Sequence, residues 1–177
     1  MTRQQYLLLA ALASGLLMTG CLSQQEVDKF NGRFMSRDSR LVRTTVDEMV
    51  AHKDHRFVKM AAAYLQDSHE VRRTPPLPDP VEARVEGAIH LLLKCAPRRA
   101  RKMLNKELSP EPSPNYRLPR WALRLASAMD SPDIWKRLCR LYRDDRLRHY
   151  ERRDIGEVLF TAGVEPVSYT HLRAHET

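Results

Sequence analysis

Apolar side chains recur at spacings of three and four residues through most of the chain, in runs separated by short polar or proline-rich breaks. The first such run covers residues 39–52 and includes Leu41, Val46 and Val50. A second run follows between Phe57 and Leu65, after a short break. This spacing gathers the apolar side chains on one face of a helix. The pattern therefore predicts two helices joined by a tight turn.

Prolines mark the starts of the later helices. Residues 74–80 form a proline-rich linker, in which Asp79 is expected to cap a helix and Pro80 to occupy its first turn. Three further helices open near one proline each, at Pro97, Pro119 and Pro132. A last helix begins near Arg152 and is expected to end at Gly163.

These elements form three helix pairs, followed by the first half of a fourth. Pro97 and Pro132 open equivalent helices and lie 35 residues apart (132 − 97). Periods of this size are typical of solenoids, in which each pair packs only against its neighbours. We expect an all-α fold, arranged as a short α-solenoid of antiparallel helix pairs, with an irregular helical bundle as the alternative.

The repeat pattern over residues 39–163 resembles that of HEAT repeats. The segment nearest to the Asp-x-x-Val-Arg motif of that family is Asp133-Ile134-Trp135-Lys136-Arg137. The resemblance implies stacked helix pairs with a concave face that binds a partner. It implies no catalytic residue.

The N-terminal segment has the pattern of a signal peptide. Arg3 precedes an apolar run over residues 6–18, which is shorter than the roughly 20 residues of a membrane-spanning helix. The run ends in Leu17-Met18-Thr19-Gly20-Cys21, which resembles the lipobox of bacterial lipoproteins, with Met18 where leucine is commonest. The resemblance implies cleavage between Gly20 and Cys21, a thioether-linked diacylglycerol on Cys21 and an acyl chain on its amino group. An ordinary signal peptide with an incidental cysteine is the alternative.

The lipobox resemblance implies a protein of the bacterial cell envelope, anchored to a membrane by two or three acyl chains. Leu22 follows the cysteine, and the absence of aspartate there favours the outer membrane, facing the periplasm, in a Gram-negative organism. We assign residues 21–38 to the lipidated cysteine and a polar tether, and residues 39–166 to the helical repeat domain.

The last eleven residues, 167–177, have no apolar period and resemble a translated sequencing adapter. We therefore expect the helical domain to be truncated near residue 166. His171 and His175 are excluded from any metal site for the same reason.

Charge is distributed unevenly along the chain, whose formal net charge is +8. Residues 22–93 carry 11 basic and 11 acidic side chains, whereas residues 94–153 carry 17 basic and 7 acidic side chains. Much of the excess falls on two predicted helices, at Arg98, Arg99, Arg101, Lys102, Lys136, Arg137, Arg140 and Arg143. If the pairs stack, these helices lie side by side and form a surface for an anionic lipid, the phosphates of an anionic glycolipid, an acidic envelope protein or nucleic acid. A solvated face without a partner is the alternative, and the lipobox disfavours nucleic acid.

Motifs of catalysis or metal binding are missing from the sequence. There is no glycine-rich phosphate loop or nucleophile elbow, and His52 and His55 straddle a predicted turn. Cys95 and Cys139 are expected to be core thiols, with a disulfide as the alternative. We therefore expect a non-catalytic interaction scaffold without metal or cofactor. The alternatives are a fragment of an enzyme whose catalytic region is missing or unrecognised, and a basic nucleic-acid-binding helical repeat.

Overall fold

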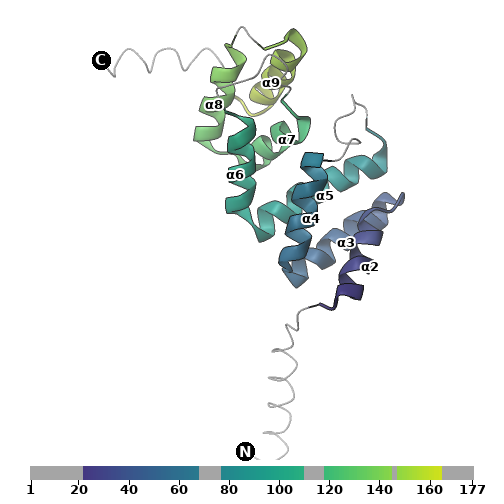
Figure 1. The fold of residues 1–177 in the computed structure, drawn as a ribbon. Coiled ribbons are helices and arrows are strands. Elements are labelled where there is room, and N and C mark those ends of the chain that lie inside the picture. Colours follow the sequence, from purple (N-terminus) through teal and green to yellow (C-terminus); the bar gives the residue numbers. More distant parts are fainter. Residues whose placement is uncertain (1–21, 68–76, 110–117, 145–146, 165–177) are drawn as a thin grey trace, which may run out of the picture.

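The computed structural model describes residues 22–67, 77–109, 118–144 and 147–164, and these segments are almost entirely helical (Figure 1). Its eight helices are α2 (Gln24–Phe34), α3 (Ser39–His52), α4 (His55–Asp67), α5 (Asp79–Cys95), α6 (Pro97–Glu107), α7 (Arg120–Met129), α8 (Pro132–Tyr142) and α9 (His149–Thr161). The described segments contain no strand. The predicted all-α class is confirmed.

The helices from α3 onwards follow one another in the order that the sequence predicts. Tight turns join α3 to α4, α5 to α6 and α7 to α8. Lys53 and Asp130 end α3 and α7 in the left-handed conformation, with φ of 53° and 39°. Pro97 and Pro132 occupy the first turn of α6 and α8, where a missing N–H costs no hydrogen bond. Gly163 has φ of 68° and follows α9, which is the role predicted for it.

Neighbouring predicted pairs contact one another through both of their helices. α3 and α4 pack against α5, α5 and α6 meet α7, and α7 and α8 meet α9. α3 and α5 approach closely at Gly87 of α5, where a Cβ atom would lie 2.5 Å from Cγ2 of Val46 on α3. Figure 1 shows the helices following one another from α2 and α3 at one end to α8 and α9 at the other. These contacts are consistent with a helical repeat and also with a bundle.

A buried arginine joins α5 to the turn between α2 and α3. Arg84 is 5% exposed. Its guanidinium donates to the hydroxyl of Tyr64 at 3.2 Å and to the carbonyls of Met35 and Ser36 at 3.2 and 2.9 Å. The ring of Tyr64 packs edge-on against Phe34, with centroids 5.5 Å apart. Polar and apolar contacts thus fix α2 onto the rest of the domain.

The assignment of a polar tether to residues 21–38 is wrong, because most of this stretch is helix α2. The hydroxyl of Ser23 accepts from the backbone N–H of Glu26 at 3.2 Å, and the Glu26 carboxylate accepts from the backbone N–H of Ser23 at 2.8 Å. This reciprocal capping box satisfies two backbone donors. Val27 and Phe34 are buried, while the polar side chains that suggested a tether lie on the outer face of the helix. Within the described residues, helical structure therefore begins at residue 24 rather than at residue 39.

Asp79 does not cap α5 as predicted. The helix begins at Asp79 itself, and Pro78 takes the capping position without a side-chain hydrogen bond. The carboxylate of Asp79 instead accepts from the hydroxyl of Ser39 at 2.7 Å and lies 3.8 Å from the guanidinium of Arg43. Because its backbone is already helical, the side chain reaches across to α3 and links the starts of the two helices.

Candidate anion-binding surface on helices α6 and α8

Two polar contacts join α6 to α8. Arg101 donates to the hydroxyl of Ser131 at 3.1 Å and to the carboxylate of Asp133 at 3.0 Å. Arg137 of α8 donates to the side-chain oxygen of Asn105 of α6 at 3.1 Å. Arg101 and Asp133 lie 32 residues apart, as do Asn105 and Arg137, so the two helices run in the same direction. The structure therefore brings the two basic helices together.

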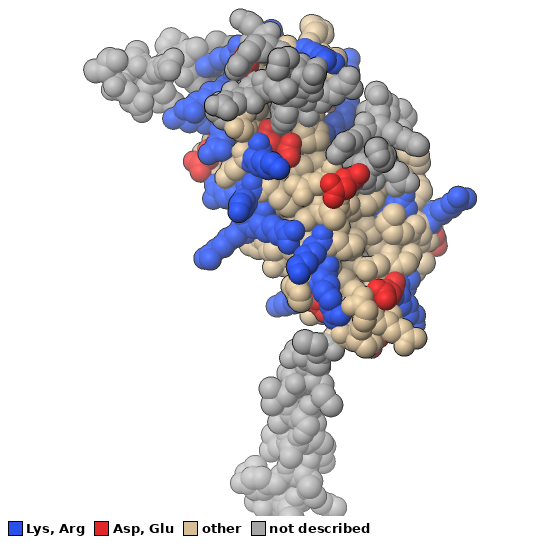
Figure 2. Space-filling model, viewed as in Figure 1, with Lys and Arg blue, Asp and Glu red and all other residues tan. Residues whose placement is uncertain are grey.

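The eight basic residues that the sequence singles out differ in their partners. Seven are exposed, and Arg137 is half-buried. Arg101 and Arg137 are engaged in the contacts between the helices. Within the described part of the chain, five make no ion pair with a carboxylate: Arg98, Arg99, Lys102, Lys136 and Arg140. Figure 2 shows the blue side chains gathered over α6 and α8, at the left of the view.

The same helices direct their apolar faces into the core, which is why the charges point outwards. On α8, Ile134 and Leu138 are almost completely buried. Trp135 is 6% exposed and donates its indole N–H to Asp130 at 3.0 Å. A helix with one apolar stripe and one charged face buries the stripe and leaves the charges to solvent. The surface is therefore fixed in place by packing beneath it.

Lys106 extends this surface and was not among the predicted residues. It is exposed and lies one turn after Lys102 on α6. The signal was present in the sequence, because residues four apart on a helix share a face. On this helix, the predicted set includes only the basic residues near its start, from Arg98 to Lys102.

Neither described cysteine is suited to act as a nucleophile. Cys139 is buried and Cys95 is half-buried, and both are free thiols. Burial raises the pKa of each thiol, so both are protonated near neutral pH. The thiolate is the reactive form of cysteine. Their surroundings instead match the core role predicted for them.

A shallow open groove of about 250 Å³ lies between α7 and α9. Arg120 at its edge pairs with Asp154 at 3.1 Å, and Arg124 pairs with Glu82 of α5. Most charges of this groove thus hold helices together. Across the described ranges, no group of three His, Cys, Asp or Glu residues is placed to hold a metal ion.

The predicted lipidation site lies outside the described residues, since the description begins after Gly20 and Cys21. Residues 167–177 also lie outside it. Among the helices that are described, none is long and apolar enough to cross a bilayer. Comparison of the chain with protein-family models, curated proteins and solved structures finds no match.

Proposed function

We propose that the protein is a lipid-anchored, non-catalytic scaffold of the bacterial cell envelope, and that the α6–α8 surface binds the phosphate groups of an anionic glycolipid. The observation that carries the proposal is the set of exposed cations without carboxylate partners on two helices that side-chain hydrogen bonds join. The anchoring part is supported by the lipobox resemblance at Cys21.

The arrangement suits an extended polyanion better than a single small anion. The free cations are spread along two parallel helices instead of converging on one enclosed cavity. Guanidinium groups bind phosphate with paired hydrogen bonds, and ammonium groups add charge at variable geometry. Arg101 and Arg137 make the contacts that hold the two helices together. The remaining cations are therefore available to bind an anion.

Nucleic acid would bind to the same charges, so the cellular compartment of the protein distinguishes nucleic acid from an anionic glycolipid as the partner. Phosphate recognition by lysine and arginine is common to lipids and nucleic acids. The lipobox resemblance favours the envelope, and therefore a glycolipid over nucleic acid.

The anchoring is tested by Cys21→Ala in the expressed full-length protein. Removal of the thiol prevents thioether formation, so we expect the protein to move from the membrane fraction to the soluble fraction. Mass spectrometry of the wild-type protein should show the acyl chains on Cys21. An unchanged membrane fraction in the variant would contradict the anchoring.

The binding surface is tested by Lys136→Glu with Arg140→Glu, against the matched control Lys29→Glu with Arg40→Glu on α2 and α3. The control residues are also exposed and form no ion pair with a described carboxylate. Both double variants change the net charge equally. We expect binding to lipopolysaccharide to fall at least tenfold in the first variant and little in the control, because each lost phosphate contact costs about 1 kcal/mol or more. Equal losses in the two variants would overturn the assignment of the surface.

A further inference from the structure

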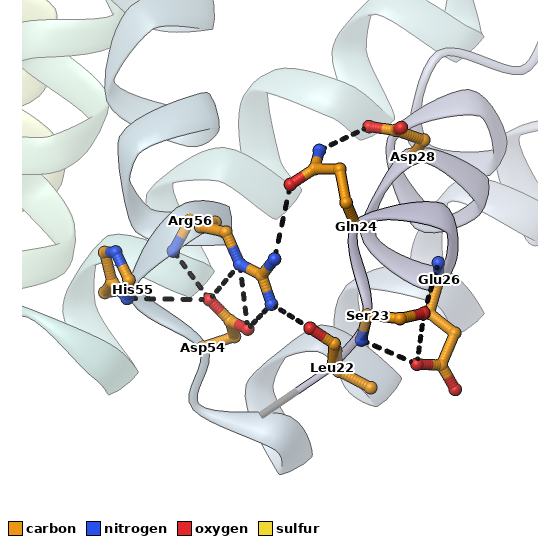
Figure 3. Close-up of polar contacts among 8 residues, drawn as sticks. All are labelled: Leu22, Ser23, Gln24, Glu26, Asp28, Asp54, His55 and Arg56. Atoms are coloured by element: carbon orange, nitrogen blue, oxygen red, sulfur yellow. Dashed lines mark hydrogen bonds and ion pairs between the residues drawn. The ribbon is translucent and has the colours of Figure 1, made fainter. Parts of the chain in front are cut away.

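The chain is held by the folded domain from Leu22 onwards (Figure 3). The guanidinium of Arg56 donates to the backbone carbonyl of Leu22 at 2.5 Å. The same guanidinium is held by the carboxylate of Asp54, with a contact of 2.6 Å. The side chain of Asp54 is only 9% exposed, and Arg56 lowers its pKa to about 2. The carbonyl is thus bound by a charge that is itself fixed in place.

The residues that follow Leu22 are fixed as well. The capping box of Ser23 starts α2. The side-chain oxygen of Gln24 accepts from Arg56 at 3.3 Å, as Figure 3 shows. Leu22 packs against the core, and Val27 is buried in it. No residue between Leu22 and α2 is left to act as a flexible spacer.

Covalent geometry carries this constraint to the preceding residue. Neighbouring Cα atoms are about 3.8 Å apart, so Cys21 stays within one residue of the point that Arg56 holds. Acyl chains on Cys21 would therefore leave the domain at this end and no other. We name it the anchor end, formed by the start of α2, the α3–α4 turn and the α5–α6 turn, which follow the lower edge of the view in Figure 1.

The anchor end carries exposed cations at two of its three segments, the α3–α4 turn and the α5–α6 turn. They are Lys53, Lys94, Arg98 and Arg99, and none forms an ion pair with a carboxylate of the described residues. The charge of Lys53 opposes, in part, the rise in the pKa of the Cys95 thiol that burial causes. Glu26 lies in the first turn of α2, also at the anchor end. Its carboxylate accepts hydrogen bonds from the backbone N–H and the hydroxyl of Ser23.

We propose that the anchor end is a membrane-contact surface for anionic phospholipid headgroups, and that Arg56 holds the domain in one orientation on the bilayer. The inference rests on the proposed acylation of Cys21. A charge acts on a membrane surface within about one Debye length, roughly 10 Å at 0.1 M salt. A flexible tether would carry these cations beyond that range most of the time, whereas a link of one residue keeps them within it.

The test uses the acylated full-length protein in vesicles of phosphatidylethanolamine and phosphatidylglycerol that contain nitroxide-labelled headgroups. A fluorophore is attached at position 53 through Lys53→Cys, or at position 37, in the α2–α3 turn, through Arg37→Cys. Both variants carry Cys95→Ser, and the thiol of Cys21 is consumed by acylation. The label at 53 reports the anchor end and the label at 37 reports the opposite end of α2. A third protein has a Gly-Ser linker of about twelve residues, spanning roughly 20 Å, between Cys21 and Leu22.

We expect quenching at position 53 to exceed that at position 37 several-fold, and the inserted linker to remove most of the difference. Equal quenching at the two positions would overturn the inference while leaving the anchoring intact. A difference that survives the linker would overturn the role of Arg56. Absence of acyl chains in the mass spectrum would overturn the proposed anchoring and this inference together, and is read separately from the quenching.

Discussion

The two halves of the domain differ in the balance of their charged residues. Between residues 22 and 93, basic and acidic side chains are equal in number, and several join helices to one another. Arg33 forms a two-pronged ion pair with Glu48 at 2.7 and 2.9 Å, and Arg84 is buried among carbonyls and a tyrosine. Between residues 94 and 153 the basic residues are in large excess, and several point to solvent without a carboxylate partner. The first half therefore uses several of its charges in its own packing. The second half leaves more of its cations exposed, where we propose that they bind a partner.

Replacement of Arg84 by alanine should have the largest effect on stability. It would leave the carbonyls of Met35 and Ser36 without their donor in a partly buried region. Each lost charged hydrogen bond at such a site costs about 1.5–3 kcal/mol, so we expect a loss of about 3 kcal/mol or more in the free energy of unfolding. Urea unfolding monitored by circular dichroism measures it. Arg40→Ala on the surface of α3 is the control, with a change within about 0.5 kcal/mol. Similar losses of stability in both variants would contradict the special role of Arg84 in packing.

Gly87→Ala should destabilise the same half through packing. The new Cβ would lie 2.5 Å from Cγ2 of Val46, so the Val46 side chain or the two helices must shift. Overpacking of this kind costs about 1–3 kcal/mol. Gly32→Ala is the control, because nothing lies within 4 Å of its Cβ position in α2. That change should instead stabilise the protein by about 0.5–1 kcal/mol. If Val46→Ala failed to rescue Gly87→Ala, the steric explanation would be wrong.

The pair formed by Asp54 and Arg56 predicts a specific loss of stability in acid. The pKa of Asp54 is lowered from 3.8 to about 2, so its contribution is complete above pH 4 and disappears as the pH falls towards 2. We expect this contribution to be about 1–2 kcal/mol. Arg56→Ala should remove the part of the acid loss between pH 4 and 2. An unchanged profile of unfolding free energy against pH in the variant would contradict this assignment.

Replacement of Lys136 and Arg140 by alanine should affect stability least. Both are exposed and form no ion pair with a described carboxylate, so the free energy of unfolding should stay within about 0.5 kcal/mol of the wild-type value. The binding of anionic glycolipid should fall in the same variant. Calorimetric unfolding and lipopolysaccharide binding measure the two effects. A large destabilisation would show that the second half also depends on these charges for packing.

The helix pairs were predictable because their signals are local. A proline in a first turn and an apolar residue at every third or fourth position need no knowledge of distant residues. Helix α2 carried such signals too, in the spacing of Ser23 and Glu26 and of Val27, Phe30 and Phe34. They were outweighed by the polar residues around them and by the expectation of a tether after the lipobox.

The contacts that define the candidate surface were not predictable in the same way. The pairing of Arg101 with Asp133 depends on how α6 and α8 are aligned, which no local pattern fixes. The clamp on Leu22 is harder still to predict, because its acceptor is a backbone carbonyl 34 residues from Arg56. The sequence could place basic residues on two helices, but only packing decides which of them pair and which stay free.

The central claim, that the second half presents free charge to an anionic partner, is tested most directly by mapping the partner onto the protein. Cys21→Ala protein labelled with ¹⁵N is titrated with a soluble phosphorylated saccharide, and the shifts of its amide signals are followed. The account predicts shifts concentrated in α6 and α8, which weaken as salt is added. Shifts concentrated in α2 to α5 would contradict this proposal. So would the absence of shifts at every saccharide concentration in the titration.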